Sequence, residues 1–97
     1  MNNDRGPVFT DQQWEQLEKR LSLPPRQRQV IRHLFDGLSD KQIADAIGVA
    51  LPTVRSHLGR IYTKYDLQDR TELVLHIFRE FISMNDLSSD GIPETDR

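Results

Sequence analysis

Side chains that can donate hydrogen bonds recur at three- and four-residue spacing between Leu51 and Tyr65. If this segment is a helix, with about 100° between successive residues, its small and polar side chains gather on one arc. They are Arg55, Ser56, Gly59, Arg60 and Thr63. Guanidinium and hydroxyl groups on such an arc can bind phosphates and base edges, and arginine suits O6 and N7 of guanine. The structural alternative is an ordinary solvated helix face.

The opposite arc of the same segment is apolar. Its four large side chains fall within about 40° of Val54 on the helical wheel and are predicted to be core. They are Val54, Leu58, Ile61 and Tyr65. Tyr62 lies on one border of the polar arc, and His57 and Lys64 lie on the other. The two arcs predict a helix over about 51–65 with one buried side and one side that the major groove of DNA could admit.

A short helix and a turn are predicted just before this segment. Residues 39–42 (Ser-Asp-Lys-Gln) have the spacing of a capping box, and Gly48 is suited to end a helix. Between them, Ala44 is small enough for a close helix crossing. A short helix, a turn and a second helix form the helix-turn-helix arrangement. Lys41 and Thr53, near the starts of the two helices, are suited to phosphate contact.

The rest of the chain also favours helices, because apolar residues recur at helical spacing and strand patterns are nearly absent. A first helix is predicted to start at Thr10, with Gln13 completing a capping box and with Phe9 and Trp14 forming a hydrophobic staple. The prolines at 24 and 25 should end it.

A second helix is predicted over about 25–35, with Gly37 as its stop, and a last helix from the capping-box segment 69–72 to about Ser83. The fold class is therefore all-α. We expect an N-terminal extension with one helix, a four-helix helix-turn-helix domain, and an acidic tail that is disordered because it has little to bury. These three parts are residues 1–22, 23–83 and 84–97.

The composition argues against several classes of function. The chain has 97 residues, enough for one domain, and no cysteine, and its three histidines are scattered, so no metal site is expected. No nucleophile and base pair, phosphate loop or carboxylate pair is visible, so we expect neither an enzyme nor a cofactor. Residues 1–7 hold no apolar run and no segment is long enough to cross a membrane, so a cytoplasmic protein is expected.

The net charge of −2 hides an uneven distribution. Residues 1–18 carry a net charge of −3, residues 19–70 one of +5 and residues 71–97 one of −4. The basic central block is where a polyanion such as DNA would find its counter-charge.

Several segments resemble the LuxR or GerE-type DNA-binding domain in their order and spacing. They are LPPRQRQVI at 23–31, GLSDKQIA at 37–44, TVRSH at 53–57, Lys64 and RTEL at 70–73. The resemblance covers about residues 21–82. It implies a four-helix domain, a recognition helix in the major groove of double-stranded DNA, and a homodimer formed through the last helix.

The resemblance also implies roles for single residues. The positions that match base-contacting places are Arg55, Ser56 and Gly59, and those that match backbone-contacting places are Lys41, Thr53 and Lys64. His57 matches a characteristic family histidine, for which a phosphate contact and a bracing role are both open.

Three residues depart from the family. Pro24 and Ala50 stand where hydroxyl residues usually cap their helices. The missing cap at Pro24 is expected to lower the free energy of unfolding by about 1 kcal/mol. Gly59 stands where a longer, often basic side chain is frequent.

Apolar residues of the last helix cover about 200° of its circumference, which is more than one core contact requires. One edge is expected to close the domain and consists of Leu73, Ile77 and Phe81. The other edge is predicted to form a dimer interface and consists of Leu75, Phe78 and Ile82. The alternative is that the N-terminal helix covers this surface with Trp14, Leu17 and Leu21.

The leading hypothesis is a sequence-specific transcriptional regulator that binds DNA as a dimer. Region four of a sigma factor, with RNA polymerase as partner, is an alternative because 23–28 and 37–39 also resemble that module, although 70–73 favours the LuxR type. A third hypothesis is a helix-turn-helix adaptor for protein partners, which fits the acidic ends and Gly59. We expect these 97 residues to leave no room for the receiver or ligand-sensing domain that many family members carry, so the chain either acts alone or is a fragment.

Overall fold

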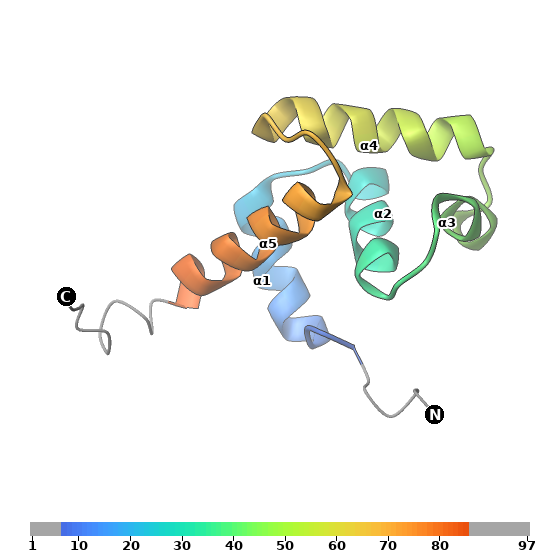
Figure 1. Ribbon diagram of the computed structural model, residues 1–97. Coiled ribbons are helices and arrows are strands. Elements are labelled where there is room, and N and C mark those ends of the chain that lie inside the picture. Colours follow the sequence, from blue (N-terminus) through green and yellow to red (C-terminus); the bar gives the residue numbers. More distant parts are fainter. Residues whose placement is uncertain (1–6, 86–97) are drawn as a thin grey trace.

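The computed structural model describes residues 7–85, which form five α-helices and contain no strand. The helices are α1 (Asp11–Leu21), α2 (Pro25–Phe35), α3 (Asp40–Ile47), α4 (Leu51–Tyr65) and α5 (Arg70–Asn85). In Figure 1, α4 runs along the upper edge of the molecule above α2, with α3 at one end and with α1 and α5 on the other side. The predicted all-α fold is confirmed.

The first helix begins as the sequence predicts. Thr10 Oγ1 accepts a hydrogen bond from the N–H of Gln13 at 3.1 Å, and the N–H of Thr10 donates to Gln13 Oε1 at 2.9 Å. The rings of Phe9 and Trp14 meet edge to face with centroids 5.1 Å apart, which completes the hydrophobic staple. The helix is followed by Ser22, which adopts a left-handed conformation with φ 55°.

Two helices begin without a side-chain cap. Pro24 precedes α2 and Ala50 precedes α4, and neither side chain bonds to its helix. Ser39 and Gln42, by contrast, form a complete capping box at the start of α3. The capping interactions that the sequence predicts to be missing are therefore missing in the structure.

The start of α5 differs from the predicted capping box. Asp69 Oδ1 accepts a hydrogen bond from the N–H of Glu72 at 3.0 Å, but Glu72 Oε1 accepts from Gln68 at 2.6 Å rather than from Asp69. The glutamate therefore reaches one residue further back than in a reciprocal box.

The end of α5 corrects the predicted tail boundary. The helix continues to Asn85, so Met84 and Asn85 are helical rather than disordered. Met84 packs against the core, and Asn85 Nδ2 donates to the carbonyl of Phe81 at 2.7 Å, which together extend the helix. The remainder of the predicted tail, 86–97, lies outside the described residues.

One hydrophobic core draws on all five helices. Its most deeply buried side chains are Leu17, Val30, Ile31, Ile43, Val54, Ile61, Leu73 and Ile77. The helix α1 contributes Trp14, Leu17 and Leu21 to this core.

Aromatic rings join the segment before α1 to α2 and α5. The ring of Phe9 lies 4.7 Å from that of Phe81 and 5.4 Å from that of Phe78, and Trp14 meets Phe35 edge to face at 5.3 Å. Phe78, predicted to form a dimer interface, is therefore partly covered within its own chain. The rings that meet Phe78 are those of Phe9 and Phe35, which the sequence did not indicate. The alternative in which Trp14, Leu17 and Leu21 cover this surface stays a prediction.

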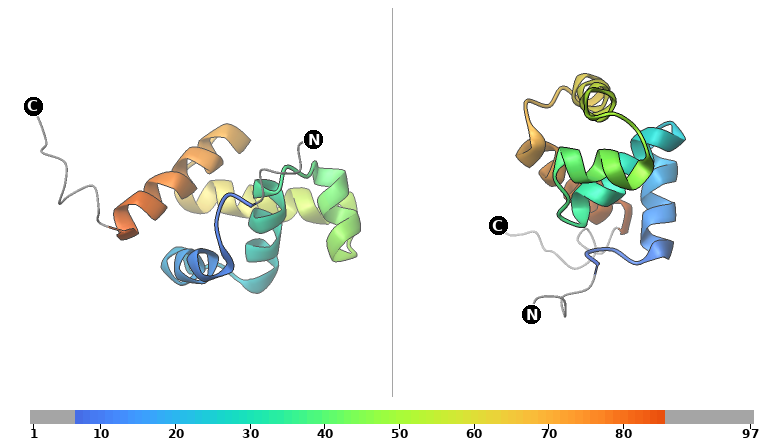
Figure 2. Two further views of the ribbon diagram at one scale, coloured as in Figure 1. Left: turned by 90° about the horizontal axis from the view of Figure 1, so that it is seen from below. Right: turned by 90° about the vertical axis from the view of Figure 1, so that its right-hand side faces the viewer.

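The two shortest ion pairs of α1 join it to α2 and to α5. Arg32 of α2 lies 2.6 Å from Glu18, and Glu80 of α5 lies 2.6 Å from Arg20. The left view of Figure 2 shows α1 beside α2 at the side of the molecule opposite α3.

Replacing Ala50 with serine should raise the free energy of unfolding by about 1 kcal/mol. Ala50 has the extended backbone of an N-cap, and a hydroxyl there can accept from the N–H of Thr53, whereas Pro52 has none to offer. Urea unfolding followed by circular dichroism measures the change. Ala46→Ser on the exposed side of α3 is the matched control and should slightly lower stability, because serine is the weaker helix former. A free energy of unfolding that is the same in Ala50→Ser and in the wild type would contradict the prediction.

Candidate nucleic-acid interface

A tight turn sets the angle between α3 and α4. Gly48 follows α3 with φ 72°, where a side chain would be strained, and the N–H of Val49 donates to the carbonyl of Ala44 at 3.0 Å. Ala44 is buried at this crossing. From α2, Arg26 Nη1 donates to the carbonyl of Ile47 at 3.2 Å. These contacts hold α3 and α4 in one orientation against α2.

The two sides of α4 are sharply different. Val54 and Ile61 have no exposed surface and Leu58 is 4% exposed, and α4 packs on α2 and α3. The opposite side is exposed and consists of Arg55, Ser56, Gly59, Arg60 and Thr63. We call these five residues the open side of α4. The right view of Figure 2 looks along α4 and shows this helix at the edge of the molecule.

Seven of the eight residues predicted to contact DNA are exposed, and His57 is half-buried. The exposed residues are Lys41, Thr53, Arg55, Ser56, Gly59, Arg60 and Lys64. Within residues 7–85, neither Lys41 nor Arg60 forms an ion pair, so both charges are available to a ligand.

Asp40, the first residue of α3, lies between two arginines. Its carboxylate oxygens are 3.4 Å from Arg70 Nη1 and 3.7 Å from Arg55 Nε. Arg70 is held further by a 2.6 Å hydrogen bond to the carbonyl of Leu38. The Arg55 side chain is 65% exposed and its contact is longer than a hydrogen bond. Its guanidinium can therefore turn toward an external acceptor at little cost.

Lys64 is occupied inside the protein. Its Nζ donates to the carbonyl of Ser22 at 2.8 Å and to that of Leu21 at 3.3 Å, and Tyr65 Oη donates to the Leu21 carbonyl at 2.7 Å. Lys64 and Tyr65 thus tie the end of α4 to the end of α1. This contact differs from the DNA-backbone contact that the family resemblance implies for Lys64. No sequence signal marks it, because the acceptors are main-chain carbonyls.

His57 lies at the border of the open side with one ring edge turned into the protein. Its Nδ1 is buried and has no hydrogen-bond partner among the described residues. Because the ring is half-buried, a phosphate contact and a bracing role both stay predictions for His57.

Gly59 lies at the centre of the open side. A Cβ atom there would meet nothing within 4 Å, and the position is inside a regular helix, so neither packing nor backbone conformation requires glycine. Relative to alanine, a glycine here weakens the helix by about 1 kcal/mol. A shallow hollow occupies this place and is lined by Ser56, Gly59, Arg60, Thr63 and Lys64.

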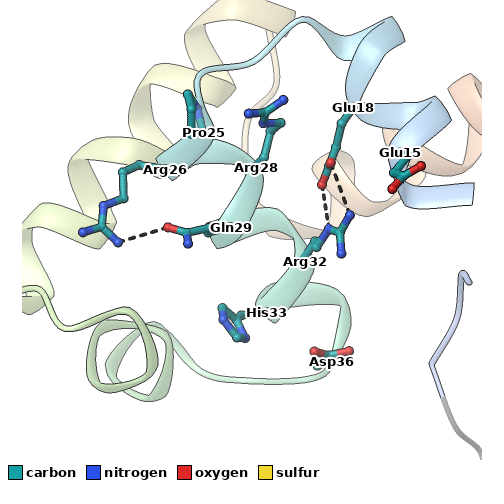
Figure 3. Close-up of a pocket in the computed structure, with 9 residues that line it drawn as sticks. All are labelled: Glu15, Glu18, Pro25, Arg26, Arg28, Gln29, Arg32, His33 and Asp36. Atoms are coloured by element: carbon teal, nitrogen blue, oxygen red, sulfur yellow. Dashed lines mark hydrogen bonds and ion pairs between the residues drawn. The ribbon is translucent and has the colours of Figure 1, made fainter. Parts of the chain in front are cut away.

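A second hollow lies between α1 and α2 and shares no residue with the open side of α4 (Figure 3). Its charged lining is balanced and consists of Arg26, Arg28, Arg32, Glu15, Glu18 and Asp36. Arg32 points toward Glu18 and donates two hydrogen bonds to it, at 2.6 and 3.3 Å, which raises the pKa of Arg32. This balance makes the hollow a poorer site for a polyanion than the open side of α4.

Over residues 7–85, no group of three or more histidine, cysteine, aspartate or glutamate side chains is placed to hold a metal ion. None of the helices in this range is long and apolar enough to cross a membrane.

A short helix, a turn through a left-handed glycine, and a longer helix with one open polar side define a helix-turn-helix domain. The chain belongs to the LuxR family, because the family described as bacterial regulatory proteins, luxR family, matches residues 21–77. The match confirms the resemblance and does not favour the sigma-factor alternative. Membership in a family of regulatory proteins also agrees with the expectation that the chain is not an enzyme.

Relatives in two bacterial genera carry similar segments. A protein of Mycobacterium tuberculosis named as an HTH-type transcriptional regulator is 43% identical over 53 residues, which are 55% of this chain and 6% of that protein. The response regulator protein VraR of Staphylococcus aureus is 32% identical over 57 residues, which are 59% of this chain and 27% of VraR. The chain thus matches only a small part of the length of these relatives. No solved structure matches the chain.

The free energy of unfolding should fall as the pH rises above about 10. Burial, followed by the charge of Glu80, raises the pKa of Tyr65, and burial, followed by the charge of Asp40, raises that of Tyr62. A tyrosine with a raised pKa stabilises the fold below its unfolded value, and this contribution is lost as the pH rises through the folded value. Urea unfolding between about pH 7 and pH 11 measures the fall.

Tyr65→Phe is the informative variant for this pH dependence. It should be less stable at neutral pH by about 1 kcal/mol, because the bond to Leu21 is lost, and its stability should decline less steeply in alkali. If the free energy of unfolding fell equally with pH in the wild type and in Tyr65→Phe, Tyr65 would not contribute to this pH dependence.

Proposed function

We propose that this chain is a sequence-specific DNA-binding module of a transcriptional regulator and that α4 lies in the major groove. The observation that carries the proposal is the open side of α4, which opposes a row of side chains with almost no exposed surface. There is no acidic residue between Leu51 and Tyr65, so phosphates on both walls of a groove would meet no like charge from this helix. The names of the two relatives support this role.

Arg55 and Arg60 lie at the two edges of the open side and are the residues we propose for base or phosphate contact. Ser56, between them, can bind either a base or the backbone. Thr53 and Lys41 are near the beginnings of α4 and α3, where free N–H groups favour phosphate. His57 and Lys64 are further candidates for a phosphate. Lys64 is exposed, and its ammonium group is also bonded to the carbonyls of Leu21 and Ser22.

The acidic residues of α1 and α5 do not contradict the proposal, because their charges are partly compensated where they lie. Glu18 pairs with Arg32 and Glu80 pairs with Arg20, both away from the open side of α4. The charge that DNA would meet is therefore local and positive, although the chain as a whole carries −2.

Arg55→Ala should weaken binding to a duplex selected from a random pool by about 1–3 kcal/mol and should leave folding intact. The loss is expected because a guanidinium that binds a base or phosphate is removed, while its loose contact with Asp40 adds little stability. Fluorescence anisotropy with a labelled duplex measures the affinity. Lys19→Ala, on the exposed side of α1, removes one positive charge away from α4 and is the control. Equal losses for both variants would contradict the placement of α4.

The same titrations separate a DNA-binding protein from a protein adaptor. Phosphate contacts make affinity fall steeply with salt concentration, and a regulator prefers its selected duplex to bulk DNA. A chain that bound no duplex under any of these conditions would favour the adaptor hypothesis.

We also propose a homodimer formed through α5. Leu75 and Ile82 are 46% and 52% exposed, and they lie two turns apart on one stripe of the helix with the partly covered Phe78 between them. A second copy related by a two-fold axis would cover both side chains at once, and a two-fold dimer suits an operator with two half-sites.

Leu75→Glu and Ile82→Glu should each prevent dimer formation, because each change removes two apolar side chains per dimer, worth about 1 kcal/mol apiece, and places two carboxylates together. Sedimentation equilibrium of the chain with a selected duplex reports the stoichiometry. Val8→Glu makes the same kind of change at an apolar residue that is 51% exposed but lies outside α5, and should keep the stoichiometry. A wild-type chain that bound every duplex as a monomer would contradict the dimer.

A further inference from the structure

The glycine at position 59 is not explained by the fold, which leaves open space where a side chain would be. The floor of the resulting hollow is the backbone of α4. Its peptide groups are bonded within the helix, so they offer neither donors nor acceptors to a ligand. The floor therefore favours an apolar group over a polar one.

Four polar side chains line the hollow around Gly59, and they are Ser56, Arg60, Thr63 and Lys64. The ammonium group of Lys64 is bonded to the carbonyls of Leu21 and Ser22. The side chains of Ser56, Arg60 and Thr63 are exposed, so their polar groups remain free for phosphates or polar base edges. The hollow is thus shallow and open, with Gly59 on its floor and hydrogen-bonding side chains around it.

We infer that the hollow at Gly59 reads a thymine through its 5-methyl group. This inference rests on the proposed function, in which α4 enters the major groove. Adenine, guanine and cytosine present polar groups there that would lose water without gaining a partner on the floor of the hollow. The thymine methyl group loses no hydrogen bond when it approaches the floor at Gly59. Gly59 is therefore a specificity-determining residue, because a side chain here would stand between the methyl group and the backbone of α4.

The test replaces each thymine of a selected duplex, one at a time, with deoxyuridine, which deletes only the 5-methyl group. Binding of the full 97-residue chain is followed by fluorescence anisotropy. For the wild type, replacement of one particular thymine in each half-site should lower the affinity by about threefold to fivefold, because the 5-methyl group is lost. Gly59→Ala should bind the selected duplex more weakly and should no longer respond to that replacement.

Folding of the variant is checked separately. Gly59→Ala should have a higher midpoint of thermal unfolding than the wild type, since the added Cβ meets no neighbour and alanine favours helix. Gln16→Ala, on the exposed side of α1, is the control for a helix substitution away from DNA and should keep the response of the wild type to deoxyuridine.

The possible results separate the two levels of the proposal. Selective binding with no response to any deoxyuridine, or an unchanged response in Gly59→Ala, overturns the role of Gly59 and leaves DNA binding intact. Failure of the wild-type chain to bind any selected duplex overturns the proposed function and this inference together.

Discussion

The row formed by Val54, Leu58 and Ile61 determines what α4 can present to its surroundings. These side chains are buried against α2 and α3, and a shift of one residue would turn the helix by about 100° and bring an arginine into the core. Burial of the apolar row therefore orients every residue of the open side without any contact from those residues themselves. The interface is a consequence of the core, and its geometry is as rigid as the packing behind it.

The N-terminal segment is the second structural constraint, because it holds α4 and α5 from the same side. Lys64 and Tyr65 bond to the carbonyls that end α1, and Phe9 packs on Phe78 and Phe81. The ammonium group of Lys64 is thereby bonded within the protein, and Phe78 on α5 is partly covered. The surface that remains exposed includes the open side of α4 and a short apolar stripe on α5, which consists of Leu75 and Ile82.

Shape and charge are distributed unevenly over this small domain. The overall charge is negative, yet Arg60 and Lys41 are unpaired within residues 7–85 while Glu18 and Glu80 are matched by arginines. At the centre of the open side, Gly59 has no side chain and leaves open space. A surface of this kind combines electrostatic attraction at its edges with recognition by fit in the middle, so affinity and specificity would rest on different residues.

The sequence by itself determined the starts of α1 to α4 and the ends of α2 and α3, because caps, prolines and glycines act within a few residues of a helix end. The helices α1 and α4 are instead capped at their ends by Ser22 and Asp66, left-handed residues that are not glycine. It also determined the two sides of α4, since a regular helix converts spacing directly into direction. Only the tertiary structure decided the partners of Lys64, the covering of Phe78 by Phe9 and the extension of α5 to Asn85. The first two are contacts between residues more than forty positions apart, and the third depends on Met84 reaching the assembled core. Main-chain carbonyls and partly covered rings carry no signature in residue type, so the fold had to bring them together before their roles became visible.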